Sequence, residues 1–387
     1  MKQALVALAI VIALPYGYAP LYEFPDPSPF AGPAFLNPYA GLRGTWQRAN
    51  LHAHGRQWGG LTNGRQPGTE IVRTYRAMGY SVAGVSDYHR IAAFEGVPTI
   101  PLYEHGYNIM KRHQLAIGAR RVDWFDFPLW QSMSHRQLVI DRVGRTADLV
   151  ALNHPPSRGA YSPDDLRRLS GYQLLEVVNG PHQAEEPWDA ALSSGHAVWA
   201  LANDDTHDLT DRDRSAVAWT MIDAPSASTA DIVDALRAGR AYAVSRTIRS
   251  APAVETVLQG FEFRDATLLV TSAGEPSTFT FVGQNGLIRK TVTDATSAAY
   301  TFATDDTYIR TVIRSPSTTM YLNPVLRYDG VRLPDPAASV AVGATWLQRG
   351  LLLGAGAAVV LIYRRRRAAA LAALPRAVLP HHGRKTA

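Results

Sequence analysis

Residues 197–207 read AVWALANDDTH, an apolar run followed by two adjacent carboxylates and then an imidazole. Helix-like stretches separate this run from others of its kind, and the alternation is typical of an α/β fold with a largely parallel sheet. Because the carboxyl ends of parallel strands share one face, we expect the polar side chains at these ends to converge. Three further runs end in the same way: Ser81 to Val85 is followed by Asp87 and His89, Val97 to Leu102 by Glu104, and Leu149 to Leu152 by His154.

Histidines concentrate in the same region of the chain, and ten of the twelve lie between His52 and His207. The pair His52 and His54 follows the run Ala49 to Leu51, and a spacing of two places both imidazoles on one side of a strand. Imidazole nitrogens and carboxylate oxygens are ligands for zinc, manganese and iron. The sequence therefore predicts a metal cluster built from His52, His54, Glu104, His154, Asp205 and His207.

Two composition regimes divide the body of the chain. Up to Tyr242 the apolar runs alternate with helix-like stretches, whereas from Ala251 to Tyr328 short β-rich runs indicate a small antiparallel sandwich. We expect the sandwich to pack against the first domain or to set its distance from a membrane, with carbohydrate binding as a weaker alternative. The predicted boundaries are a proline-rich linker at 23–45, an α/β domain at 46–247 and a β-sandwich at 248–335.

Both ends of the chain carry apolar segments. Ala4 to Leu14 follows Lys2 and is typical of a signal peptide or an uncleaved signal anchor, assigned to residues 1–22. Residues 341–363 are long enough to span a membrane, and four arginines follow at once. Clustered arginines mark the cytoplasmic side, so we expect the tail at 364–387 inside and the folded body outside. A basic amphipathic tail lying on a membrane or on nucleic acid is the alternative.

The net charge of +6 comes from the ends of the chain. Lys2 supplies one positive charge and residues 337–387 supply eight, which leaves residues 23–336 at −3. A mildly acidic body lacks the attraction on which a nucleic-acid groove depends, so we expect no nucleic-acid partner. The absence of cysteine fits an extracytoplasmic location, and the sequence gives no indication of an oligomeric state.

The ordered motifs NLHAHG, VSDYH, PLYEHG, LNHPP and ANDDTH resemble those of the polymerase-and-histidinol-phosphatase (PHP) superfamily of metal-dependent phosphoesterases. The likeness covers roughly half the chain and extends to IVDALRAGRAY at 232–242. It implies a distorted (β/α)7 barrel and adds Asp87, His89 and His113 to the expected metal ligands. The chain departs from the family at 55–60, GRQWGG, and at Tyr88, which separates Asp87 from His89.

The resemblance also implies two or three divalent ions, Zn, Mn or Fe. Such ions would activate a water molecule and neutralise phosphoryl oxygens, with Glu104, Asp205 and His207 as the expected catalytic residues. Arg56, Arg158 and His182 are candidates for contact with substrate. By analogy with the family, His52, His54, Glu104 and Asp205 would hold one ion, Glu104, His113 and His154 a second, and His207 with Asp87 or His89 a third.

We therefore expect a membrane-anchored, extracytoplasmic phosphoesterase that acts on a small phosphorylated substrate. Two other functions remain open. An amidohydrolase-like enzyme would use the same ligands but usually adds a metal-bridging lysine, and Lys111 is the only lysine between Lys2 and Lys290. A non-catalytic, metal-bearing receptor would use the sandwich for recognition.

Overall fold

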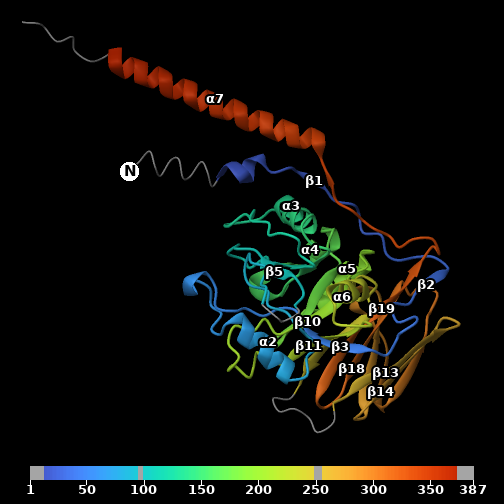
Figure 1. Ribbon diagram of the computed structural model, residues 1–387. Coiled ribbons are helices and arrows are strands. Elements are labelled where there is room, and N and C mark those ends of the chain that lie inside the picture. Colours follow the sequence, from blue (N-terminus) through green and yellow to red (C-terminus); the bar gives the residue numbers. More distant parts are fainter. Residues whose placement is uncertain (1–12, 95–98, 248–254, 373–387) are drawn as a thin grey trace, which may run out of the picture. The chain divides into compact units, whose positions relative to one another are not determined.

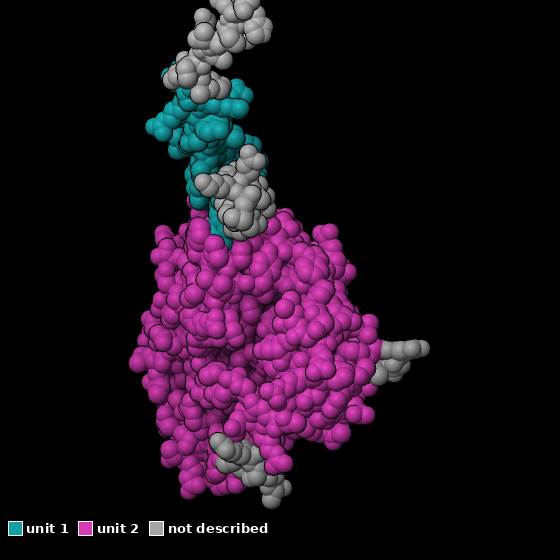
Figure 2. Space-filling view, turned by 90° about the vertical axis from the view of Figure 1, so that its left-hand side faces the viewer, with its two compact units in different colours: residues 1–21, 340–387 teal, residues 22–339 magenta. Residues whose placement is uncertain are grey.

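The computed structural model describes residues 13–94, 99–247 and 255–372. They fall into two compact units, one formed by both ends of the chain (1–21 and 340–387) and one by residues 22–339, coloured separately in Figure 2. The expected signal segment at Ala4 to Leu14 lies almost entirely outside the described residues, as does the end of the basic tail at 373–387.

The unit formed by the chain ends is dominated by one long helix, α7 (Val342–Ala372), which follows the short strand β20 (Ser339–Val340). Residues 342–370 are long and apolar enough to cross a membrane, which confirms the expected helix of spanning length. Its apolar side chains are exposed to solvent, for example Leu353 at 75%. A helix that is apolar on all sides needs an apolar environment, so a lipid bilayer suits this surface.

The larger unit contains a six-stranded mixed sheet (Figure 1). Its strands β10, β8 and β7 run parallel, while β6 pairs antiparallel with both β7 and β5. Residues 106–113, which join β5 to β6, are too few for the crossover that parallel strands need. In spatial order the strands are β10 (Trp199–Asn203), β8 (Leu174–Asn179), β7 (Leu149–Leu152), β6 (Gln114–Ile117) and β5 (Leu102–His105), with β9 (His182–Gln183) beside β8.

A second, nine-stranded sheet takes strands from both sides of residue 247. It is antiparallel except where β3 pairs with β4. Its order is β16 (Ile288–Ala295), β15 (Ser277–Val282), β18 (Tyr308–Arg314), β19 (Thr318–Tyr328), β12 (Ala241–Arg246), β11 (Ala218–Asp223), β3 (Trp46–Asn50) and β4 (Val82–Ala83), with β2 (Ala34–Leu36) also beside β19.

The α/β class is as expected, but the sheets differ from the expected barrel. Within the described ranges neither sheet closes on itself, and the strands expected to form one barrel are divided between the two sheets. The expectation of a largely parallel sheet was also wrong, because β11, β12 and β19 pair antiparallel. Pairing of this kind depends on contacts between distant segments, which the local alternation of strands and helices does not encode.

Three helices coincide with helix-like stretches of the sequence. α2, α4 and α6 match the stretches at 70–78, 164–169 and 229–238 to within two residues. Ser162 caps α4 and Ser228 caps α6 by accepting a hydrogen bond from the backbone of the third helical residue. The bounds are α2 (Gly68–Ala77), α3 (Met133–Gly144), α4 (Pro163–Arg168), α5 (Glu185–Ser193) and α6 (Thr229–Arg237), and a two-residue strand, β1 (Tyr22–Glu23), opens the unit.

A three-stranded antiparallel sheet packs on the part of the nine-stranded sheet that β15, β18 and β19 form. Its strands are β13 (Val257–Arg264), β14 (Thr267–Ala273) and β17 (Ser297–Thr301). Phe261, Phe281 and Phe302 are buried between the layers, so these aromatic side chains belong to the core.

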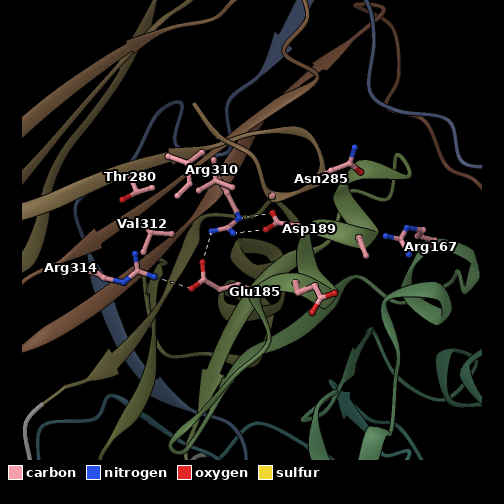
Figure 3. Close-up of a pocket in the computed structure, with 13 residues that line it drawn as sticks. Arg167, Glu185, Asp189, Thr280, Asn285, Arg310, Val312 and Arg314 are labelled. Carbon is pink, nitrogen blue, oxygen red and sulfur yellow. Dashed lines mark hydrogen bonds and ion pairs between the residues drawn. The ribbon is translucent and has the colours of Figure 1, made fainter. Parts of the chain in front are cut away.

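A buried ion pair joins α5 to β18 (Figure 3). The guanidinium of Arg310, 2% exposed, donates to both carboxylate oxygens of Asp189 at 2.6 and 2.7 Å and to Glu185 at 3.0 Å. Arg314 also donates to Glu185 at 3.0 Å. Removing one partner of a buried pair leaves an uncompensated charge, so this contact fixes α5 against the nine-stranded sheet.

Candidate metal centre

The two large sheets place the predicted ligands next to one another. His52 and His54 follow β3, and Ala53 between them bridges to Thr206. Glu104 lies in β5 and His113 directly precedes β6. The other ligands come just after strand ends: His154 after β7, and Asp205 and His207 after β10.

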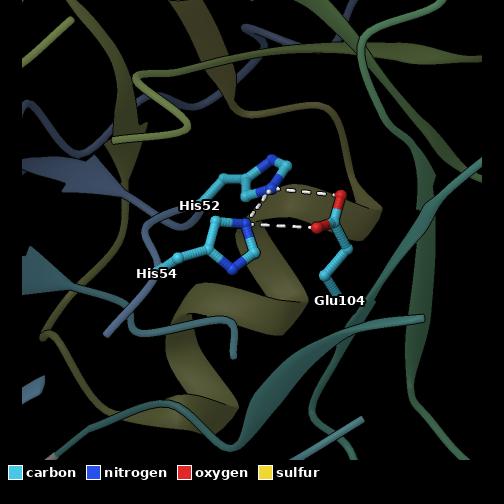
Figure 4. A group of neighbouring side chains, drawn as sticks. All are labelled: His52, His54 and Glu104. Atoms are coloured by element: carbon cyan, nitrogen blue, oxygen red, sulfur yellow. Dashed lines mark hydrogen bonds and ion pairs between the residues drawn. The ribbon is translucent and has the colours of Figure 1, made fainter. Parts of the chain in front are cut away.

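These residues form four overlapping groups whose ligand atoms lie within 4.8 Å of one another. In the first group, drawn in Figure 4, Nε2 of His52 and Nε2 of His54 lie 3.2 and 3.1 Å from the two carboxylate oxygens of Glu104. The groups are His52, His54 and Glu104; His52, His154 and Asp205; His54, Asp205 and His207; and Glu104, His113 and His154.

Glu104 stands at the centre of this arrangement and is fully buried. Its Oε1 also lies 3.0 Å from Nδ1 of His113 and 3.2 Å from Nε2 of His154. Burial raises the pKa of Glu104, but the imidazoles of His113 and His52 outweigh it and hold the pKa well below its usual range. The carboxylate is therefore ionised and is shared between two of the groups.

The donor set fits divalent cations. Five buried atoms of these ligands have no hydrogen-bond partner among the described residues: Oε2 of Glu104, Oδ1 of Asp205, Nε2 of His207, and Nδ1 of both His54 and His154. Nδ1 of His52 is hydrogen-bonded to the carboxylate of Glu176, which leaves the lone pair of His52 on Nε2. That Nε2 lies 3.1 Å from Nε2 of His54. Buried polar atoms are costly without a partner, and cations at these groups would satisfy carboxylate and imidazole lone pairs together.

The backbone is strained at two of the ligands. His154 has a φ of 32° and Asp205 a φ of 52°, in the left-handed region that favours glycine. Each costs roughly 1–3 kcal/mol and persists only where the surrounding structure fixes it. In both cases the strained residue follows a parallel strand of the six-stranded sheet.

Glu176, in the middle of β8, supports the ligands from behind. Its Oε1 accepts hydrogen bonds from Nδ1 of His52 at 2.7 Å and from Asn203 at 2.9 Å. Its Oε2 accepts from the backbone N–H of His154 at 2.9 Å and from Asn179 at 3.0 Å. A carboxylate behind a ligating histidine fixes its tautomer, here with the lone pair on Nε2. This role was not predicted from the sequence, although a glutamate inside the apolar strand LLEVVN is a usable signal.

Asp87 and His89 lie outside the four groups. Oδ1 of Asp87 accepts from the backbone of Gly55 at 2.8 Å, and burial raises its pKa. His89 bonds through both ring nitrogens, to the carbonyl of Asp123 and from the N–H of Gly106, each at 3.1 Å. Burial and then the neighbouring His105 lower the pKa of His89 to about 4. The neutral ring thus has both nitrogens occupied by backbone groups.

A cavity of about 440 Å³ opens onto the centre at His113. Arg158, one of the substrate candidates, lines it, whereas Arg56 and His182 are exposed and do not. Tyr88 lines it as well: its ring stacks on His54 at 4.4 Å and its hydroxyl bonds to Glu104. Tyr88 was not predicted as a site residue, since in the motif VSDYH it only separates Asp87 from His89.

Fold and site together define an α/β protein with a buried centre suited to divalent metal ions. No protein-family model matches the chain, and no curated protein matches it. A solved structure with some likeness is a two-domain protein from Bacteroides vulgatus that contains a predicted PHP-like metal-dependent phosphoesterase. The match covers 82% of this chain and 99% of that one, with 13% identity and a TM-score of 0.41. At that level the two folds differ too much for the match to bear on the function of this chain.

Proposed function

We propose that this chain is a metal-dependent phosphoesterase. The observation that carries the proposal is the convergence of four overlapping groups of buried ligands around Glu104. Divalent ions held there would supply a Lewis acid for phosphoryl oxygens and lower the pKa of a water molecule.

The chain's own residues have separable roles in this proposal. Glu104 belongs to two groups and links the positions that they define. Nδ1 of His207 lies 2.8 Å from the carbonyl of Asp205, and its pKa is lowered to about 4 by burial and by His54. The neutral ring therefore presents an unprotonated Nε2 at the edge of the centre.

Charge at the cavity favours phosphoesters over amides. Lys111 and Arg158 line the cavity that opens at His113, and cations of this kind bind phosphate oxygens. A neutral amide gains nothing from them.

The proposed setting is the outer face of a membrane. Helix α7 has the length and composition of a membrane span, and Arg364 to Arg367 lie in its last part. Arginines at one end of a span favour the cytoplasmic side for that end, which would place residues 22–339 outside.

The test is metal analysis combined with a substrate screen on the full chain in detergent. Metal-loaded protein is expected to hydrolyse phosphomonoesters or phosphodiesters and to leave amides intact. Glu104→Gln should abolish the rate, whereas Glu186→Gln, the same change at an exposed position, should not alter it. Metal-loaded protein that cleaves no phosphoester would refute the proposal.

A further inference from the structure

Exposed apolar side chains surround the mouth of the metal centre. Leu61, Tyr107 and Ile109 line the same cavity as His113 and are 89%, 48% and 55% exposed. Trp58 and Trp124, 48% and 58% exposed, lie beside one another with ring centroids 5.8 Å apart. These five residues, Trp58, Leu61, Tyr107, Ile109 and Trp124, are termed the collar.

The collar is continuous although it comes from three loops. The indole N–H of Trp58 donates to the carbonyl of Tyr88, a cavity residue, at 3.0 Å. The hydroxyl of Tyr107 donates to the carbonyl of Trp124 at 3.3 Å. The collar therefore forms one surface around the entrance rather than scattered exposed residues.

Its composition fits a membrane interface. A contiguous exposed apolar surface beside a site marks a binding surface, and tryptophan or tyrosine mixed with aliphatic side chains is typical of segments that enter the interface of a bilayer. A nucleobase or a sugar would stack on Trp58 and Trp124 but would gain little from Leu61 and Ile109. The aliphatic members therefore favour lipid.

The charges at the mouth complement an anionic headgroup. Lys111 and Arg158 line the cavity, and none of the described residues that line it is an aspartate or a glutamate. Arg158 donates to the carbonyl of Ile109 at 3.1 Å, which holds its guanidinium beside the collar. Basic side chains at a bilayer surface attract anionic lipids.

We propose that the substrate is a phosphoester carried by a membrane lipid, an inference that rests on the proposed phosphoesterase function. The collar enters the interface, the acyl chains stay in the bilayer, and the headgroup passes Lys111 and Arg158 to reach the centre. In the reaction the oxygen of water bonds to phosphorus and the P–O ester bond breaks. The leaving oxygen takes a proton derived from that water. An enzyme that is itself anchored by a helix such as α7 has this substrate at hand.

The first test compares lipid and water-soluble esters with the same headgroup. The full chain is reconstituted in phosphatidylcholine vesicles containing phosphatidic acid or phosphatidylglycerol, with glycerol 3-phosphate and glycerophosphoglycerol as the soluble counterparts. Leu61→Ser combined with Ile109→Ser should lower kcat/KM on the lipids about tenfold more than kcat/KM on the soluble esters. Leu287→Ser combined with Ile288→Ser is the matched control, since these residues are 57% and 61% exposed on the β-sandwich.

A second test reads contact with the bilayer without catalysis. Metal-free protein is reconstituted with brominated phosphatidylcholine, and tryptophan quenching is compared with that of the variant Trp58→Phe, Trp124→Phe. Part of the quenching should disappear in this variant. Fractional quenching that is equal or higher in the variant would mean that the collar does not reach the bilayer, and the inference would be overturned.

The outcomes separate the two proposals. The lipid substrate alone is overturned if soluble esters are cleaved at the same rate as lipids, or if the collar variant keeps its full activity on lipids. If the protein prefers nucleotides to lipids and Trp58→Leu abolishes that preference, the lipid substrate is overturned in favour of base stacking. No phosphoester cleaved by metal-loaded protein overturns the proposed function and the lipid substrate together.

Discussion

Replacing Glu176 by glutamine tests whether the carboxylate behind His52 sets the metal affinity of the centre. The two oxygens of Glu176 accept four hydrogen bonds, two each. Glutamine keeps one oxygen and replaces the other by an NH2 group. The NH2 group of glutamine would therefore face two N–H donors in either orientation of the side chain. In one orientation these donors are His52 and Asn203, and in the other they are His154 and Asn179.

The size of the effect follows from these contacts. If the NH2 group faces His52, the ring can regain a hydrogen bond only by moving its proton to Nε2, the atom that faces Glu104. That tautomer cannot ligate. Loss of such a supporting group typically lowers metal affinity about 10- to 100-fold. We expect a shift of this size in competition titrations with a chelating dye, together with a lower melting temperature from the unpaired donors.

The control is Glu186→Gln, which makes the same chemical change at an exposed position. Circular dichroism of both variants would verify that the fold is retained. A folded Glu176→Gln protein that binds metal as tightly as the wild type would show that His52 does not need this carboxylate, and the reasoning would be wrong.

Three other outcomes are expected. Arg310→Met should lower the free energy of unfolding by about 3–5 kcal/mol in denaturant titrations, because it leaves Asp189 buried without its counter-charge. His113→Ala should reduce the metal bound per chain, measured by elemental analysis, whereas His182→Ala, an exposed histidine outside the groups, should not. Burial lowers the pKa of His196 below 6.5. As the pH decreases from about 6.5, only the unfolded chain takes up the proton, so the stability of the folded protein should fall. His196→Gln should weaken this pH dependence in thermal melts.

The candidate ligands that follow strand ends were predictable from local sequence. The runs that became β7 and β10 are short, apolar and bounded by polar residues, so local pattern alone placed His154 and Asp205 at the same edge. Glu104 lies inside β5 and His113 directly precedes β6, and the antiparallel pairing of these two strands brings them together. The pattern did not need the exact sheet topology to indicate the cluster.

The rest depended on contacts that local sequence does not encode. Asp87 and His89 follow an apolar run just as Asp205 and His207 do, yet backbone groups occupy both nitrogens of His89. Glu176 was not predicted because it lies inside its strand, whereas the predicted ligands were sought just after strand ends. The predicted barrel failed because pairing across long sequence distances decides which strands are neighbours, and β12 pairs with β19 rather than closing a ring.

The strand β12 connects the two halves of the larger unit. It has β11, from the half with the candidate metal centre, on one side and β19, from the sandwich half, on the other. A cut after residue 247 would strip β12 of one neighbour and expose a row of unpaired N–H and C=O groups, which promotes edge-to-edge aggregation. We therefore expect the two halves to fold as one cooperative unit. A gene fragment that encodes only the half with the candidate metal centre should give a protein that aggregates.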